Sequence, residues 1–183
     1  MKYGLITMDR LEFDGFTGAM TTSPYVIAAT TAAVSSAAVG GLFYAFSTFV
    51  MKGLDHAEPI EAITAMRGIN AEAQANAPFL LLFVGSALLA LVVGVITVLQ
   101  FSRPGSSYIV AGTVLALMAF VVTMAFNVPL NNTLDALDPT AMSATDALRE
   151  WQAYLGPWTA WNHVRTVAPL MGSVLMLVGL RYR

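Results

Sequence analysis

Long runs of apolar residues, separated by more polar segments, are the dominant pattern along the chain. Four such runs cover residues 24–50, 78–101, 108–126 and 164–180. The first three contain no Lys, Arg, Asp or Glu, whereas the fourth contains Arg165 and Pro169. A helix needs about 20 residues to cross a bilayer, and a segment in lipid must satisfy its own backbone hydrogen bonds. The pattern therefore predicts four membrane-spanning helices.

The two longer connections between these runs also show helical patterns. After Pro59, which suits a first helical turn, apolar residues recur at helical spacing through the first connection. In the other connection, Thr145 is expected to cap a short helix that Gly156 and Pro157 end. The predicted fold class is an all-α, integral membrane four-helix bundle with short extramembrane helices in the 1–2 and 3–4 loops.

The composition supports a membrane location. Apolar residues make up 57% of the chain and charged residues 11%, with a mean hydropathy of +0.68, whereas an average soluble domain carries about 25% charged residues. The formal net charge is −2 without a basic run, so no nucleic-acid partner is expected. The lipid bilayer is the expected partner, and a homo-oligomer is left open.

The charge distribution bears on topology. Residues 1–24 are interpreted as a short cytosolic tail and residues 25–183 as the membrane domain, with the natural start at Met1 or Met20. Basic residues near the spans favour the cytoplasmic side. Five lie on the side of the termini: Lys2, Arg10, Arg103, Arg181 and Arg183. We therefore expect a multi-pass protein of the plasma membrane with both termini in the cytoplasm.

Polar side chains gather near the non-cytoplasmic ends of three spans. In WTAWNHVRT, residues 158–166, helical spacing places Trp158, Trp161, Asn162 and Arg165 on one face. The third span ends with Asn127 and Asn131 on either side of Pro129. At the entry to the second span, Glu72 and Asn76 form an i, i+4 pair whose helical face is expected to continue into the membrane.

Ionisable groups at membrane depth are costly unless they are paired, so we predict a polar cluster in which Arg165 pairs with Glu72. Three alternatives are structural. The Trp residues belong to an interfacial belt, Arg165 extends to the headgroups, or the Asn residues join helices.

The sequence offers little for a metal or haem. It contains no Cys and only two histidines, His56 and His163, whereas a catalytic zinc takes three protein ligands. Haem ligation by both histidines is kept as an alternative, and no cofactor is expected.

Three segments together resemble a known family. They are GLFYAFSTFVMKGL at 41–54, NVPLNNTL at 127–134 and WTAWNHVRT at 158–166. The chain resembles the anthrone oxygenase-like integral membrane family, formerly a domain of unknown function, over roughly residues 26–180. The resemblance implies a four-span protein that oxidises an anthrone-type lipophilic polycyclic aromatic with O2 and without a cofactor.

The resemblance also suggests roles for the polar cluster. The expected catalytic residues are His163 or Glu72 as base, with Asn131 and Arg165 as donors to a developing oxyanion. The expected substrate-binding residues are Asn127, Asn162, Trp158, Trp161, Asn76, Phe43 and Tyr44. The alternative function is a non-catalytic membrane accessory or a lipid- or small-molecule-binding protein. A cavity of about 300 Å³ or more beside the polar cluster favours a ligand-binding function over a purely structural one.

Overall fold

The computed structural model describes residues 23–183, so the predicted N-terminal tail lies outside the described residues except for its last two positions. In chain order the elements are α1 (Pro24–Ala45), the π-helical turn η1 (Phe46–Val50), α2 (Met51–Asp55), α3 (Pro59–Ala75), α4 (Ala77–Leu99), α5 (Ser106–Val122), the π-helical turn η2 (Thr123–Asn127), α6 (Val128–Asp135) and α7 (Ala144–Arg181). Every element in this part of the chain is a helix.

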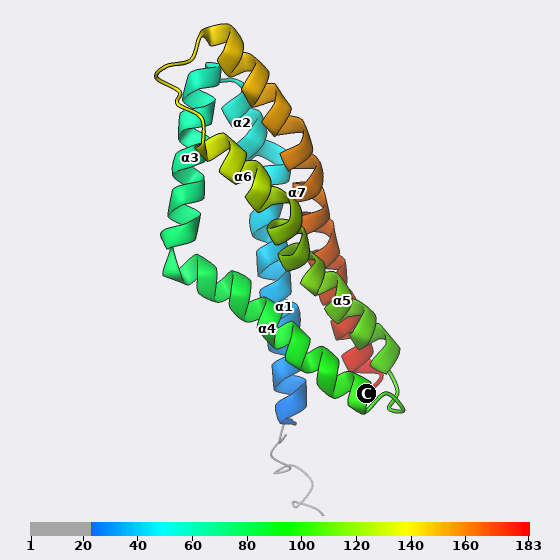
Figure 1. The fold of residues 1–183 in the computed structure, drawn as a ribbon. Helices are drawn as coiled ribbons and strands as arrows, with labels where there is room; N and C mark the ends of the chain where they lie inside the picture. Colours follow the sequence, from blue (N-terminus) through cyan, green and yellow to red (C-terminus); the bar gives the residue numbers. More distant parts are fainter. Residues whose placement is uncertain (1–22) are drawn as a thin grey trace, which may run out of the picture.

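Four helices are long and apolar enough to cross a membrane. They are Pro24–Asp55, which joins α1, η1 and α2; α4; Ser106–Asp135, which joins α5, η2 and α6; and α7. The beginning of α1 and the C-terminus lie at one end of the molecule, and the α2–α3 and α6–α7 connections lie at the other (Figure 1). The predicted all-α four-helix membrane bundle is confirmed.

The helix predicted for the 3–4 connection is not a separate element. It is the N-terminal part of α7, which runs through Gly156 and Pro157 without interruption, so the expected stop there is wrong. A proline inside a helix removes one backbone hydrogen bond. Burial of Trp151, Tyr154 and Trp158 along the same helix offsets that loss. The fourth helix consequently begins 20 residues before the predicted span at 164.

Residues 126–135 also continue a helix that was expected to end. The π-helical turn η2 precedes Pro129, and the backbone N–H of Val128 bonds the carbonyl of Thr123, five residues back. Such a turn is a common way to insert an extra residue into a helix. It lets α5 continue into α6 despite the proline.

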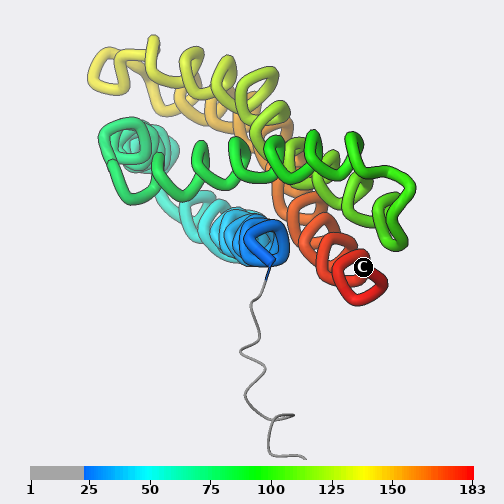
Figure 2. The backbone as a smooth tube through the Cα atoms, turned by 90° about the horizontal axis from the view of Figure 1, so that it is seen from below, coloured from blue at the N-terminus to red at the C-terminus, as the bar shows by residue number. Residues whose placement is uncertain are grey.

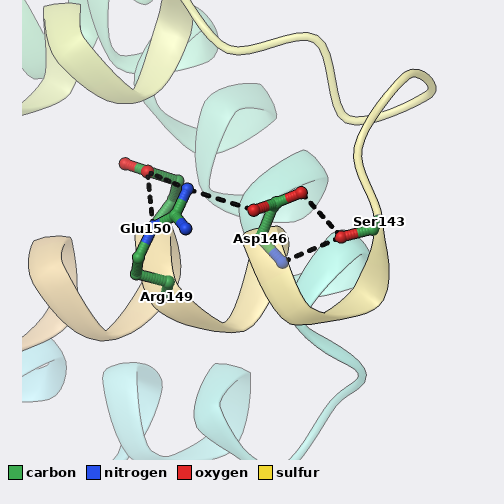
Figure 3. A network of polar contacts seen from close by, with 4 residues as sticks. All are labelled: Ser143, Asp146, Arg149 and Glu150. Atoms are coloured by element: carbon green, nitrogen blue, oxygen red, sulfur yellow. Dashed lines mark hydrogen bonds and ion pairs between the residues drawn. The ribbon is translucent and has the colours of Figure 1, made fainter.

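The N-terminus of α7 is held by a local network (Figure 3). The hydroxyl of Ser143 accepts a hydrogen bond from the backbone N–H of Asp146 at 3.1 Å and donates to its carboxylate at 2.7 Å. Arg149 pairs with Asp146 at 3.1 Å and with Glu150 at 3.4 Å. The cap is therefore Ser143 rather than the expected Thr145, which lies inside the helix.

Glycines allow α5 and α7 to approach to backbone contact. A Cβ added to Gly172 would lie 2.6 Å from the carbonyl oxygen of Gly112, and one added to Gly112 would lie 2.6 Å from that of Gly172. Small residues at helix contacts allow this kind of approach in membranes. The pair fixes α5 against α7 along the half of the bundle that holds the C-terminus.

The second span has a corner at Asn76. Its backbone is extended there (φ −82°, ψ 100°), and its side-chain oxygen accepts the N–H of Phe79 to cap α4. From this corner α4 runs obliquely across the bundle towards α5 (Figures 1 and 2). α3 lies in the half of the bundle that is away from the C-terminus (Figure 1). α3 packs against α7 through Ala62, Ile63 and Met66, and the corner then turns the chain away from this contact into α4.

We predict that Gly172→Ala destabilises the bundle. The new methyl group would meet backbone atoms at 2.6 and 2.9 Å, and overpacking of this kind costs about 1–3 kcal/mol. Thermal unfolding in detergent should show a lowered midpoint. The matched control is Gly41→Ala, whose added Cβ meets nothing within 4 Å. Equal midpoints for the two variants would contradict the close α5–α7 contact.

We expect Ser143→Ala to loosen only the first turns of α7. Loss of an N-cap costs about 1 kcal/mol, so hydrogen exchange should accelerate over residues 144–148. Thr145→Ala is the control, because Thr145 is exposed within the helix. Faster exchange in the Thr145 variant than in the Ser143 variant would show that the cap is wrongly assigned.

Candidate functional site

A cavity of about 570 Å³ lies beside the α3–α4 corner. The helices α1, α5, α6 and α7 form the rest of its wall. Its wall is largely apolar and aromatic, with polar groups contributed by α3, η2, α6 and α7. The lining residues are Leu42, Phe43, Phe46, Met66, Ile69, Asn70, Ala73, Gln74, Phe79, Leu80, Phe83, Val84, Phe120, Thr123, Met124, Val128, Asn131, Asn132, Trp158 and Arg165. This size and lining are typical of a small-molecule site.

Arg165 is the charged residue of the cavity wall and is only 4% exposed. Its Nη2 donates to the side-chain oxygen of Asn162 at 2.8 Å, and Nη1 lies 3.4 Å from the Thr123 hydroxyl. The guanidinium carbon is 4.2 Å from the ring centre of Phe43 and 4.8 Å from that of Trp158. Neutral oxygens and aromatic faces therefore stabilise this cation.

The predicted ion pair between Arg165 and Glu72 is wrong. Among residues 23–183 the salt bridges join Arg67 to Asp135 and Arg149 to Asp146 and Glu150, and Glu72 is exposed. The prediction assumed one continuous helix from Glu72 into the second span. The corner at Asn76 changes the direction of the chain and so breaks the assumed alignment of faces.

Asn162 holds Arg165 in place. It is fully buried, and its amide nitrogen donates to the Phe43 carbonyl and to the Ser47 hydroxyl, both at 2.8 Å. Its oxygen receives the Arg165 hydrogen bond, so the amide orientation is fixed by partners on both sides. Ser47 belongs to η1 and Thr123 to η2. Both π-helical turns thus contribute to the site, as such turns frequently do.

Asn131 organises the other polar part of the wall. Its side-chain oxygen accepts the Tyr154 hydroxyl at 2.9 Å and the Trp158 indole N–H at 2.8 Å. Asn127 is fully buried and donates to the Trp158 carbonyl at 3.2 Å, while its own side-chain oxygen has no partner. Asn127 and Asn131 from NVPLNNTL thus bond Trp158 from WTAWNHVRT, and these hydrogen bonds join the third span to the fourth.

Some expected site residues lie away from the cavity. His163 is exposed, and its Nδ1 lies 3.0 Å from the Ser47 hydroxyl. Two residues along a helix correspond to about 200° of rotation, so His163 and Arg165 face opposite sides of α7. His56 follows α2 on the surface. Neither histidine lines the cavity, and neither does Glu72.

Three other expected substrate contacts also have different surroundings. Tyr44 is 55% exposed, although its neighbour Phe43 lines the cavity. Trp161 stacks on Phe126 with ring centres 3.7 Å apart. Asn76 is the α4 cap described above. Of the residues predicted to bind substrate or to act in catalysis, the cavity wall includes Phe43, Asn131, Trp158 and Arg165.

Asn70 is a wall residue that the predicted site omitted. It is 5% exposed, and its amide nitrogen has no hydrogen-bond partner in the described part of the chain. The available signal was its spacing, because Asn70 follows Ile63 and Met66 at i+7 and i+4 on the buried face of α3. A polar residue that interrupts such an apolar stripe points to a buried site.

An aromatic group on α4 was missed for a similar reason. Phe79 and Phe83 stack with ring centres 5.7 Å apart, and Phe83 also contacts Phe43 at 5.9 Å and Phe120 at 5.6 Å. Their i, i+4 spacing places both rings on one face of the helix. In an apolar run, however, the sequence does not show whether that face contacts protein or lipid. These rings give the cavity flat walls, which suit an aromatic ligand.

The polar groups on the wall favour an anionic or oxygen-bearing ligand. Arg165 has donors and no acceptor, and its Nε is buried without a partner. In residues 23–183 no group of three or more His, Cys, Asp or Glu side chains is arranged to hold a metal ion. The site can thus bind a flat apolar molecule and stabilise negative charge on one of its oxygens.

A comparison with protein families identifies a match for the sequence. The sequence model described as anthrone oxygenase matches residues 71–175, a range that includes Asn131, Trp158 and Arg165. No curated protein and no solved structure matched the chain. Because the matched range exceeds half of the chain, this oxygenase-like membrane protein belongs to the anthrone oxygenase family.

Proposed function

We propose that the protein oxidises an anthrone-type, lipophilic polycyclic aromatic to the corresponding quinone with O2, inside this cavity and without a cofactor. The observation that carries the proposal is the burial of Arg165 beside the cavity. This side chain is a buried guanidinium without a carboxylate partner in the described residues, at the wall of a 570 Å³ aromatic cavity. An anion formed on the ligand would supply the missing counter-charge.

The first step of the proposed reaction is loss of the anthrone C–H proton. The conjugate base is an aromatic phenolate, and Arg165 stabilises its oxygen where the negative charge develops. The bases expected from the sequence, Glu72 and His163, do not line the cavity. In the proposed reaction, water at the cavity mouth therefore accepts this proton. The exposed residues Gln74 and Asn132 lie there.

The remaining steps need O2 and one returning proton. The phenolate transfers one electron to O2, and the resulting substrate radical and superoxide combine at the ring carbon opposite the oxygen. The peroxide takes up a proton and loses water, which leaves the second carbonyl of the quinone. One oxygen atom of O2 thus enters the product and the other forms water. In this scheme the protein contributes charge stabilisation and positioning.

Non-catalytic binding of a small lipophilic molecule is the second candidate function. It is favoured by one observation, the lack of a Glu, Asp or His side chain on the cavity wall. The same aromatic surfaces and the same buried cation would hold an oxygen-bearing ligand without reacting. Consumption of O2 by the purified protein with anthrone separates the two functions.

We predict that Arg165→Gln slows anthrone oxidation by about 100-fold or more, since removing one oxyanion donor typically costs 10²–10³ in rate. The rate of anthraquinone formation above spontaneous oxidation is measured together with O2 uptake in lipid nanodiscs. Arg149→Gln, on the exposed surface of α7, is the matched control and should retain the wild-type rate.

Folding is checked separately by gel filtration and thermal unfolding, and Arg165→Lys provides a second variant that retains the charge. Wild-type turnover in a folded Arg165→Gln protein would refute the catalytic role of Arg165. Saturable anthrone binding without O2 uptake by the wild-type protein would favour the second candidate.

We further propose that the protein resides in the plasma membrane with both termini in the cytoplasm. Arg181 and Arg183 lie at the C-terminal end of α7, and Arg103 lies in the α4–α5 connection, whose Gly105 contacts Gly179 of α7. Basic residues favour the cytoplasmic side. The α6–α7 connection then lies outside.

Cysteine labelling tests this orientation directly, because the natural chain has no Cys. We expect a membrane-impermeant maleimide to label Ala141→Cys on intact cells. Ser102→Cys, which is exposed in the α4–α5 connection, should react only after permeabilisation. The reverse pattern would invert the proposed topology.

A further inference from the structure

We propose that the cavity opens sideways into the bilayer, through a slot between α3–α4 and η2–α6, and that an acyl chain of a membrane lipid occupies it until a ligand enters. The slot is defined by the exposed residues of the cavity wall, which are Gln74, Leu80, Val84, Met124 and Asn132. The inference concerns access to the cavity and its resting occupant, so it does not depend on the proposed oxidation.

The exposed part of the cavity wall comes from two sides of the structure. Gln74, Leu80 and Val84 follow one another along α3 and α4, whereas Met124 and Asn132 belong to η2 and α6. The wall residues from α1, η1 and α7 are buried or partly buried. The opening of the cavity therefore lies between the α3–α4 side and the η2–α6 side.

Contacts between these two sides close the slot at both ends. At one end, Arg67 of α3 donates to the Leu137 carbonyl at 2.9 Å and lies 3.6 Å from the Asp135 carboxylate, which joins α3 to the end of α6. At the other end, the ring of Phe83 on α4 contacts that of Phe120 on α5, with ring centres 5.6 Å apart. The cavity is therefore open through its side and not along the axis of the bundle.

The polarity of the slot changes in the same direction along both sides. On one side, the polar Gln74 precedes Leu80 and Val84, and Val84 lies about 10 Å along α4 from its first residue. On the other side, the polar Asn132 lies about 12 Å along the helix from Met124. Both sides thus pass from polar residues near the Arg67 contacts to apolar residues inside the spans, as the bilayer passes from headgroups to hydrocarbon.

The apolar end of the slot is continuous with the surface that faces lipid. Leu80, Val84 and Leu88 recur every fourth residue along α4, and all three are exposed, although Leu88 lies outside the cavity wall. Val121 is exposed in the same way one turn before Met124 and also lies outside the wall. Bilayer hydrocarbon that covers these helices therefore reaches the rim of the slot directly.

An acyl chain is the occupant that this geometry favours. A space of about 570 Å³ left empty would deprive its lining of dispersion contacts. Water needs polar partners, and the rings of Phe79 and Phe83 offer none at the apolar end. A chain from the adjoining lipid fills this end without crossing a polar region. A lipophilic ligand takes the same route and displaces the chain.

Quenching of tryptophan fluorescence by lipids with brominated acyl chains tests the proposal in nanodiscs, because bromine quenches an indole only at close approach. Trp161→Phe removes the partly exposed tryptophan, and the remaining Trp151 and Trp158 are 2% and 3% exposed. Of these two, Trp158 lines the cavity and Trp151 does not. We expect brominated chains to quench the emission of Trp158. Leu88→Trp in the same protein is the positive control, since it places an indole on the lipid-facing surface.

Narrowing the slot should prevent this quenching. Val84→Phe combined with Met124→Phe adds a ring on each side of the slot, and we expect most of the quenching of Trp158 to disappear. The matched control is Leu88→Phe combined with Val121→Phe, which adds the same rings at exposed positions outside the cavity wall. It should retain the quenching. Thermal unfolding checks that both proteins fold, and Leu80→Phe is the substitute if the slot variant does not.

Two results would overturn the proposal. One is an unquenched Trp158 in a protein whose Leu88→Trp indole is quenched, and the other is equal quenching in the slot variant and its control. Quenching of Trp158 by aqueous acrylamide but not by brominated chains would also refute it, because the cavity would then open to water. Anthrone oxidation without bromine quenching would remove this inference alone, whereas bromine quenching without oxidation would remove the proposed reaction alone.

Discussion

The structure depends on one constraint, the burial of the Arg165 cation without a carboxylate beside it. An unpaired buried charge is costly unless other groups solvate it. Here Asn162 provides a hydrogen bond, and Phe43 and Trp158 provide aromatic faces. These partners come from two of the long helices, so solvating one side chain determines how these helices meet.

Two features of the helices make that solvation possible. The π-helical turns η1 and η2 place Ser47 and Thr123 next to the Asn162–Arg165 pair. The corner at Asn76 leads α4 away from the same level, so the space beside the cation is not filled by a packed helix. Towards the C-terminal end of α7, the Gly112–Gly172 contact keeps the bundle tight. Towards the start of α7, Trp151 and Tyr154 form a second packed region with Ile63 of α3. Along α7, Arg165 and the cavity therefore lie between two packed regions.

The sequence predicted the spans better than their ends. Uninterrupted apolar runs identify lipid-crossing helices because lipid excludes exposed charges and unsatisfied backbone. Helical spacing also correctly placed Trp158, Asn162 and Arg165 on one face. By contrast, Gly156 and Pro157 are local stop signals, and local signals do not reveal that burial of Trp151 and Tyr154 outweighs one lost hydrogen bond. The pairing with Glu72 failed because a single extended residue, Asn76, changed the direction of the second span.

The absence of a counter-ion among the described residues also bears on selectivity between states of a bound ligand. A neutral anthrone, its phenolate and the final quinone share nearly the same flat shape, so the aromatic walls hold them about equally. In the proposed reaction, Arg165 would distinguish the phenolate by its charge, and such a preference for a reactive state is what catalysis requires. A carboxylate paired with Arg165 would cancel that preference by satisfying the cation in every state. The neutral partners Asn162 and Thr123 therefore fit the proposed oxidation better than the ion pair expected from the sequence.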